Sequence, residues 1–169
     1  MKKKIIIFMP SIEGGGVEKN LILVTNYLSR KINKITLITI SKKFKNKFDK
    51  SVEFKTLNLD IWDKLSRRFK YFLALILLIK EFLKDKQRLV FSFQANIYCI
   101  ILAMFFGKQI ITRSNSSPTG WTKNYVKNFI FWLLLKYPKN VIVNSKNFKK
   151  ELDKKFNLNS KVIYNPLNK

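Results

Sequence analysis

The chain of 169 residues contains no histidine and a single cysteine, Cys99. Without histidine the chain lacks the usual general base and a common zinc ligand, so Ser-His-Asp catalysis and zinc chemistry are excluded within it. One cysteine cannot form a disulfide inside the chain. Because Cys99 lies in the apolar run "IYCIILAMFF", it is interpreted as a small core residue and not as a thiolate site.

The sequence also lacks an apolar run long enough to cross a bilayer. The longest runs cover 71–79, 97–106 and 129–135, whereas a spanning helix needs about 20 residues. The N-terminal "MKKKIIIFMPS" starts with positive charge, but its apolar part is too short for a signal peptide and no cleavage-site pattern follows. We therefore expect a cytoplasmic protein, either free or peripheral on the inner face of the cell membrane.

Acidic residues are scarce, and arginine is scarce among the basic ones. The chain has 34 Lys and Arg against 10 Asp and Glu, a formal net charge of +24. Arginine, which is favoured for bidentate phosphate and base recognition, occurs only at Arg30, Arg67, Arg68, Arg88 and Arg113. The charge therefore has two open interpretations, attraction to an anionic membrane surface or an AT-rich coding bias, and no nucleic-acid partner is expected.

What is present is a regular alternation of strand and helix patterns. Continuous β-branched or alternating runs predict strands at 4–9, 34–40, 52–59, 88–93, 109–113, 140–144 and 161–164. Helical spacing predicts helices at 17–32, within 61–86, and at 96–107, 121–137 and 146–156. This order predicts a single α/β domain over 1–169, a Rossmann-like doubly wound and mostly parallel sheet with helices on both faces.

Three consecutive glycines, Gly14, Gly15 and Gly16, separate the first predicted strand from the first predicted helix. In a doubly wound sheet, ligands bind beyond the carboxyl ends of the strands, and glycines there let backbone amides approach a phosphate. The alternative is that the glycines only make a tight turn.

Other phosphate-binding patterns are missing. A dinucleotide fingerprint starting at Gly14 needs a third glycine at position 19, which is Lys19, and no acidic residue ends the second strand. NAD binding is therefore disfavoured. The P-loop pattern and an Asp-x-Asp metal motif are also absent from the sequence, so we expect no cofactor and no metal site.

Three stretches resemble family 4 glycosyltransferases and occur in the family's order. "GGGVEKNLILVTNYLSRKINKITLIT" is similar to the family's opening, G-G-x-E followed by a helix and a strand. "LVFSFQANIYCIILAMFFGKQIITRSNSSPTGW" resembles the middle strand, helix and strand whose following loop faces the cleft. "SKNFKKELDKKFNLNSKVIYNPLN" resembles the passage that ends the first domain.

The resemblance implies the amino-terminal, acceptor-side half of a GT-B enzyme, a retaining glycosyltransferase that moves a sugar from a nucleotide-sugar to a cell-surface glycan or lipid-linked acceptor. It places the glycine triplet near the donor diphosphate, with amides that stabilise charge on the leaving phosphate. Glu18 would cap the first helix or orient the loop. The cleft would also contain Asn96, Arg113, Ser114 and Asn115. Relatives often carry a histidine in the loop that here reads "RSNSS".

The family's donor-binding domain would follow Lys169. We therefore expect the chain alone to be inactive or to need a separate carboxyl-terminal half. The alternative function is a catalytically dead basic module that binds an anionic membrane surface or, as the less favoured ligand, nucleic acid. The stretches at 64–86 and 121–137 combine lysines with aromatic residues, which suits membrane docking. Packing of their apolar faces on the sheet is the favoured interpretation, and the two roles are compatible.

Overall fold

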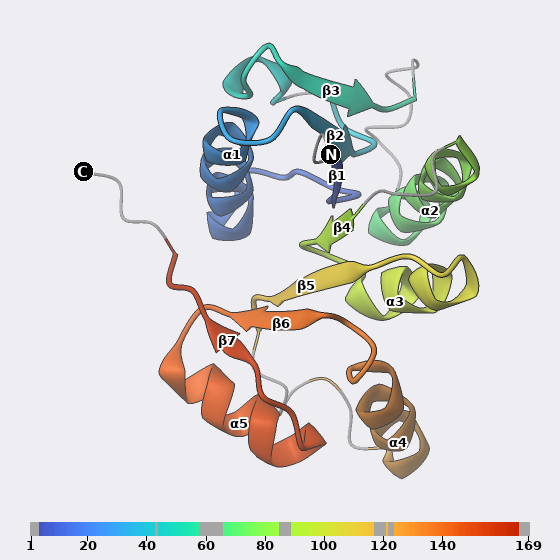
Figure 1. Ribbon diagram of the computed structural model, residues 1–169, viewed down its shortest axis with the longest axis vertical. Helices are drawn as coiled ribbons and strands as arrows, with labels where there is room; N and C mark the ends of the chain where they lie inside the picture. Colours follow the sequence, from blue (N-terminus) through green and yellow to red (C-terminus); the bar gives the residue numbers. More distant parts are fainter. Residues whose placement is uncertain are drawn as a thin grey trace.

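The computed structural model describes residues 4–42, 44–57, 66–84, 89–116, 121 and 124–165. Within these residues, seven parallel strands form one sheet in the order β3-β2-β1-β4-β5-β6-β7 (Figure 1). The strands are β1 (Lys4–Phe8), β2 (Lys34–Ile38), β3 (Val52–Lys55), β4 (Leu89–Ser92), β5 (Ile110–Ser114), β6 (Asn140–Val143) and β7 (Lys161–Val162). The predicted α/β class with a Rossmann-like parallel sheet is confirmed.

The helices connect consecutive strands, as parallel pairing requires. They are α1 (Gly16–Ser29), the short 3-10 turn η1 (Lys45–Lys47), α2 (Arg67–Lys84), α3 (Asn96–Phe105), α4 (Tyr125–Leu134) and α5 (Lys146–Phe156). Chain order runs outward from β1 to β3 on one side and from β4 to β7 on the other. The strand order therefore reverses between β1 and β4, which is where doubly wound sheets bind ligands.

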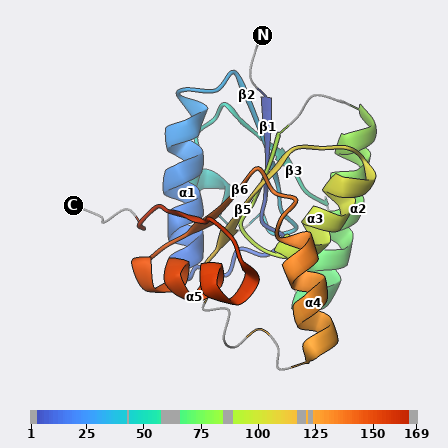
Figure 2. The same cartoon turned by 60° about the horizontal axis from the view of Figure 1, so that its bottom comes forward.

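Strand β1 lies in the middle of the sheet and is covered on both faces. Ile6 and Phe8 are fully buried against α2, α3 and α4, whereas Ile5 and Ile7 pack toward α1. Figure 2 shows α1 on one side of the strands and α2, α3 and α4 on the other. Burial on two faces explains why the strand is continuously apolar.

Cys99 lies on the buried side of α3 and is fully buried. Desolvation raises the pKa of its thiol to about 12, although a hydrogen bond with Ser92 acts in the opposite direction. The thiol is therefore neutral at physiological pH, in agreement with its predicted core role.

Helices α1 and α4 end before the predicted residues 32 and 137, at Ser29 and Leu134, and α4 also begins later than predicted. Helix α4 begins at Tyr125 and not at Trp121, because Asn124 has extended backbone and its side chain accepts a hydrogen bond from the backbone N–H of Lys127. Asn124 is therefore the N-cap, a role that asparagine performs well. Residues 58 and 59 of the predicted third strand and 61–65 before α2 lie outside the described residues.

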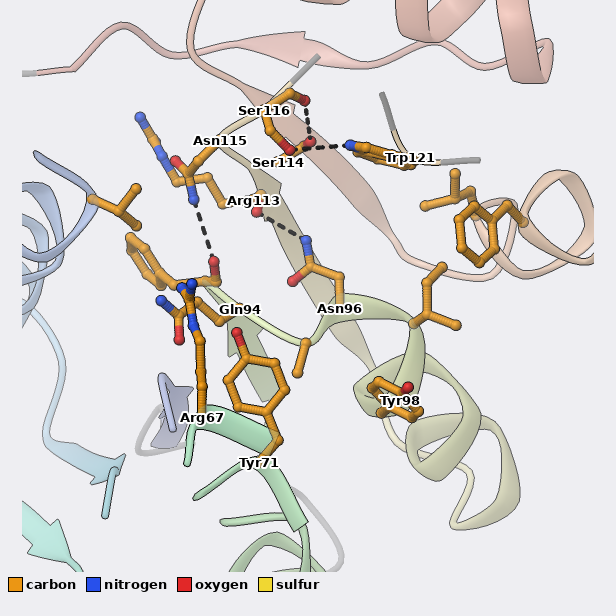
Figure 3. Close-up of a pocket in the computed structure, with 16 residues that line it drawn as sticks. Arg67, Tyr71, Gln94, Asn96, Tyr98, Arg113, Ser114, Asn115, Ser116 and Trp121 are labelled. Carbon is orange, nitrogen blue, oxygen red and sulfur yellow. Dashed lines mark hydrogen bonds between the residues drawn. The ribbon is translucent and has the colours of Figure 1, made fainter. Parts of the chain in front are cut away.

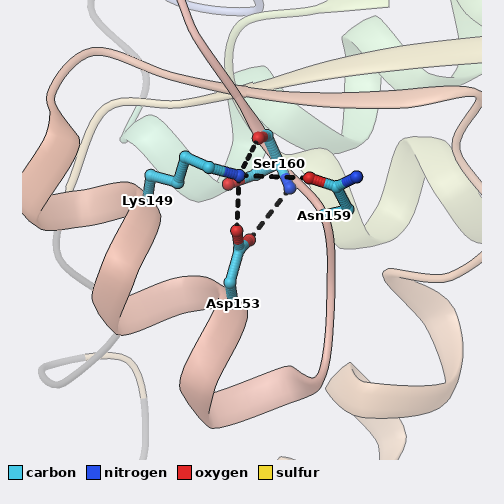
Figure 4. Close-up of polar contacts among 4 residues, drawn as sticks. All are labelled: Lys149, Asp153, Asn159 and Ser160. Carbon is cyan, nitrogen blue, oxygen red and sulfur yellow. Dashed lines mark hydrogen bonds and ion pairs between the residues drawn. The ribbon is translucent and has the colours of Figure 1, made fainter.

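The end of α5 is tied to the strand that follows it (Figure 4). Asp153 binds Lys149 Nζ at 2.7 Å through one carboxylate oxygen and accepts from the Ser160 backbone N–H at 2.9 Å through the other. Lys149 also donates to the Ser160 carbonyl and to Asn159 Oδ1. Partial burial acts to raise the pKa of Asp153, but the bonds from Lys149 and Ser160 lower it overall. This cluster orients β7 and the chain beyond it.

Within the part of the chain that the structure describes, no helix is long and apolar enough to span a membrane.

Candidate functional site

A cleft of about 670 Å³ opens beyond the carboxyl ends of β4 and β5 (Figure 3). Its walls come from the start of α1, one face of α2, the β4–α3 turn, the segment after β5, and α4 with the residue that follows it. The cleft therefore lies beside the reversal of strand order and at the carboxyl ends of the strands, the end of the sheet at which the sequence predicted a ligand. Its lining includes Asn96, Arg113, Ser114 and Asn115, all of which the sequence analysis assigned to the cleft.

The turn after β4 has unusual backbone geometry. Ala95, the residue before α3, is left-handed with φ of 55° and ψ of 34°, and no side chain caps the helix there. A non-glycine residue in this region costs about 1 to 2 kcal/mol. Because Ala95, Asn96 and Ile97 line the cleft, the strained turn presents the first turn of α3 to it.

Asn96 links the ends of two strands. Its Oδ1 accepts from Ser92 Oγ at 2.8 Å, and its Nδ2 donates to the Arg113 carbonyl at 2.9 Å. Both polar ends of the side chain are thus engaged within the protein. Asn96 holds β4 and β5 in register at the cleft rim.

Two further residues shape the segment after β5. Asn115 Nδ2 donates to the Phe93 carbonyl at 3.2 Å, and Ser114 Oγ donates to the Ser116 carbonyl at 3.2 Å. The indole N–H of Trp121 donates to Ser116 Oγ at 3.0 Å. These bonds close the segment against β4, so the cleft has a defined wall on this side.

Among the described residues, Arg113 is the largest fully buried side chain, with 1% of its surface exposed. Its Nη2 donates to the Ile163 carbonyl at 3.0 Å and to Asn165 Oδ1 at 2.9 Å. The Asn20 side-chain oxygen, in the amide orientation that satisfies its surroundings, accepts from Nη2 at 2.9 Å and from Nε at 3.0 Å. Arg113 thus joins β5 to α1 and to the chain beyond β7.

Burial lowers the pKa of Arg113, but a guanidinium stays protonated at neutral pH. Among the described residues no carboxylate pairs with it. A buried cation held by neutral oxygens leaves positive potential at the cleft wall. The resemblance placed Arg113 in the cleft, and the structure shows that its head group is buried and joins three segments of the fold.

The glycine loop borders the cleft without lining it. Gly14 adopts a φ of +94°, which favours glycine, and Gly15 precedes α1 without a side-chain cap. Val17, in the first turn of α1, is a lining residue. All three glycines are exposed, so their backbone is accessible beside the cleft.

Glu18 packs against this loop. It is buried, and its Oε2 lies 2.9 Å from the position that a Cβ on Gly15 would occupy. Of the two roles considered for Glu18, this contact fits orientation of the loop. The absence of a side chain at Gly15 gives the carboxylate its space.

Sequence reasoning missed most of the residues that line the cleft, among them Arg67, Tyr71 and Gln94. Arg67 and Tyr71 are one turn apart on α2 and line the cleft, and the guanidinium of Arg67 lies 5.9 Å from the Tyr71 ring centroid. Gln94 lines it too, and its buried Oε1 has no hydrogen-bond partner in the described part of the chain. The four-residue spacing of Arg67 and Tyr71 indicates that they share one face of a helix. The sequence does not reveal that this face of α2 meets the cleft.

No group of three or more His, Cys, Asp or Glu residues that could hold a metal ion occurs among the residues with described positions.

Comparisons with known proteins identify the fold. No protein-family model and no curated protein sequence matches the chain. Among solved structures, Anabaena Alr3699/HepE in complex with UDP and glucose matches with a TM-score of 0.67 and 16% identity, over 98% of this chain and 45% of that one. Phytolacca americana UGT2 complexed with UDP-2fluoro-glucose and pterostilbene matches at 0.53 and 11%, over 96% and 53%.

A UDP-glucosyltransferase from Polygonum tinctorium also matches, with a TM-score of 0.53 and 14% identity, over 100% of this chain and 53% of that one. The chain thus spans about half the length of the structures that it matches. At these identities the likeness concerns the fold alone, and membership of family 4 stays a prediction. The chain has the fold of one Rossmann-like half of GT-B structures.

Proposed function

We propose that the chain is the acceptor-side half of a retaining glycosyltransferase that transfers a sugar from a nucleotide-sugar to a cell-surface glycan or lipid-linked acceptor. The observation that carries the proposal is the cleft at the reversal of strand order, bordered by the exposed glycine loop and walled in part by Arg113, a buried cation that pairs with no carboxylate among the described residues. Structures with a similar fold were solved with UDP and UDP-glucose, which supports a nucleotide-sugar as the donor.

Each part of the cleft has a role in this proposal. The amides of Gly14, Gly15 and Gly16 face the donor diphosphate and stabilise negative charge on the leaving phosphate. Glu18 holds the loop, and the positive potential of Arg113 favours an anionic group in the cleft. Gln94 Oε1 is a buried acceptor without a partner among the described residues, and a sugar hydroxyl supplies the donor that it lacks.

The proposed enzyme is completed by a donor-binding half, in the same or a separate chain, and works on the inner face of the cell membrane. The retaining stereochemistry rests on the resemblance to family 4. The stereochemistry can be determined from the anomeric configuration of the product that the two combined halves form.

The test measures binding of UDP-glucose and UDP to the 169-residue chain by saturation-transfer NMR. We expect weak binding that Gly16→Val abolishes. A Cβ at Gly16 meets no atom within 4 Å beyond its neighbours and its own helix backbone, so we expect valine to fit the fold while covering the loop amides. Tyr27→Ala, on the exposed side of α1, is the control and should bind as the unmodified chain does. Absence of binding, or equal binding by Gly16→Val, would contradict the proposal.

The second candidate function is a basic module that binds an anionic membrane surface without sugar transfer. The exposed apolar residues of α2, α3 and α4 favour it. It predicts vesicle binding by a chain that binds neither UDP nor UDP-glucose, and that transfers no sugar when a matching donor-binding half is added. Preferential binding of DNA over vesicles would contradict both functions.

A further inference from the structure

The outer surface of α2, α3 and α4 is apolar where a solvated helix is normally charged. The three helices lie side by side on one side of the sheet, with α3 in the middle (Figure 2). Each carries exposed large apolar side chains: Phe69, Phe72 and Leu83 on α2, Tyr98, Ile101, Met104 and Phe105 on α3, and Tyr125, Val126, Phe129, Ile130 and Leu133 on α4. We call this set the aromatic face.

Helix α3 departs furthest from the charged surface of an ordinary solvated helix. Its sequence, NIYCIILAMF, contains no charged residue. Cys99, Ile100 and Ala103 are buried against the sheet, yet Phe105 is 82% exposed. A helix that is apolar all round is normally covered on all sides, and exposed apolar surface of this extent marks an interaction site.

Among the described residues of these helices and the residues just beyond α4, the exposed charges are of one sign. Exposed cations on α2 and α4 and just beyond α4 are Arg67, Arg68, Lys80, Lys84, Lys127 and Lys136. The sequences of the three helices contain one carboxylate, Glu81, which is buried and lies 3.5 Å from Lys84 Nζ. The described part of these helices thus combines exposed apolar and cationic groups, without an exposed carboxylate.

The combination of exposed apolar and cationic groups favours some kinds of binding partner over others. Pairing of the face with a second copy of the chain would bring cations against cations without an exposed acid to offset them. An anionic lipid bilayer offers both a negative surface and an apolar interior. Tyrosine and tryptophan suit the boundary between the two, and Lys136 Nζ lies 3.4 Å from the ring centroid of Trp132, which stacks on Phe129.

We propose that the aromatic face docks the protein on an anionic lipid bilayer, with the aromatic side chains in the headgroup region and the surrounding cations on lipid phosphates. Tyr98 belongs both to this face and to the lining of the cleft, and Arg67 borders both. The docked cleft therefore opens at the membrane surface. A lipid-linked acceptor is the substrate class that meets it there. This last step rests on the proposed function, but the docking does not.

The test is co-sedimentation of the chain with vesicles of equal parts phosphatidylglycerol and phosphatidylcholine, compared with vesicles of phosphatidylcholine alone. Because a strongly basic chain adheres to any anionic surface, the decisive variant keeps every charge. Phe72→Ser, Phe105→Ser and Phe129→Ser together remove one exposed ring from each helix, and should raise the lipid concentration for half-maximal binding by at least about tenfold.

The matched control is Leu23→Ser with Tyr27→Ser, which removes two exposed apolar side chains from α1, across the sheet. It should bind as the unmodified chain does. The single variant Phe105→Ser changes one highly exposed side chain, preserves the fold, and should weaken binding about threefold or more. Circular dichroism and thermal unfolding check that each variant is folded.

Three outcomes would overturn the docking proposal: no binding to anionic vesicles, equal binding by the triple variant and the unmodified chain, or a self-associated chain that the triple variant makes monomeric. The last would assign the face to a second copy. Vesicle binding without UDP-glucose binding would leave the docking intact and remove the proposed sugar transfer, so the two failures are distinguishable.

Discussion

Gly15 and Gly16 are neighbours in the sequence but meet different surroundings. A Cβ on Gly15 would lie 2.9 Å from Oε2 of the buried Glu18, whereas a Cβ on Gly16 meets nothing within 4 Å. A single sequence does not separate these two positions, because both belong to the same glycine run. Their difference gives a matched pair of substitutions.

We predict that Gly15→Ala destabilises the protein by less than about 1 kcal/mol, because the new methyl group makes the end of the flexible Glu18 side chain shift. Gly16→Ala should be neutral or stabilise by up to about 1 kcal/mol, through the reduced freedom of the unfolded chain. Urea unfolding of both variants measures the difference. Equal effects at the two positions would show that Glu18 does not pack on the loop as described.

Arg113 is buried because it joins segments that are distant in sequence. We predict that Arg113→Lys destabilises the protein by at least about 2 kcal/mol, because an ammonium cannot reproduce the Nη2 and Nε bonds to Asn20, Ile163 and Asn165. The exposed Arg67 is the control, and Arg67→Lys should change stability by less than about 0.5 kcal/mol. Chemical denaturation distinguishes the two, and a similar effect at both positions would argue against the buried network.

At the scale of elements, β3 is held at the edge of the sheet by charge as well as by its backbone ladder. Glu53 accepts from Thr36 Oγ1 at 3.0 Å and pairs with Lys34 at 3.1 Å and with Lys55 at 2.6 Å. Desolvation acts to raise the pKa of Glu53, but the bonds from Lys55, Lys34 and Thr36 lower it to about 2. The ionised carboxylate therefore favours the folded state.

Since the pKa of Glu53 is lower in the folded than in the unfolded chain, its contribution to stability is present above the unfolded value of 4.5 and is lost as pH falls through about 2. We predict that Glu53→Gln lowers stability at neutral pH, by less than about 1 kcal/mol because the pair is partly exposed. The difference in unfolding free energy between Glu53→Gln and the unmodified chain should vanish near pH 2. A pH series of unfolding free energies measures it, and a difference that grows on acidification would contradict the assignment.

The cleft depends on element ends and not on element interiors. Ala95 and Asn96 follow β4, Ser114 ends β5, and Asn115 follows it. The parallel arrangement brings these ends to one edge of the sheet, which is why residues from strand-to-helix turns that the sequence singled out line the same cleft. Arg67 and Tyr71 come from the side of a helix, and a helical pattern does not state which neighbour that side meets.

At the scale of the whole molecule, the net charge of +24 is the main source of long-range electrostatic repulsion. Repulsion among like charges favours the expanded, unfolded chain, and salt screens it. Few ion pairs oppose this effect, because acidic residues are scarce.

We therefore predict that the melting temperature rises between about 0.01 M and 0.15 M KCl, as the Debye length shortens from about 30 to about 8 Å. A gain of about 1 kcal/mol corresponds to about 2 to 4 °C in a chain of this size. Differential scanning calorimetry measures the shift. A falling melting temperature would mean that local ion pairs such as Glu53 with Lys55 outweigh the overall repulsion.

By itself, the sequence determined the class of the fold and the end of the sheet that carries the cleft. Both follow from local patterns, because the alternation of strands and helices requires a parallel sheet, and glycines and polar residues stand where strands end. Tertiary structure alone decided that Arg113 binds Asn20 and Asn165, that Glu18 packs on Gly15, and that α3 exposes an uncharged side. These outcomes depend on how elements distant in sequence cross and pack, and periodicity records only that a face is apolar, not what covers it.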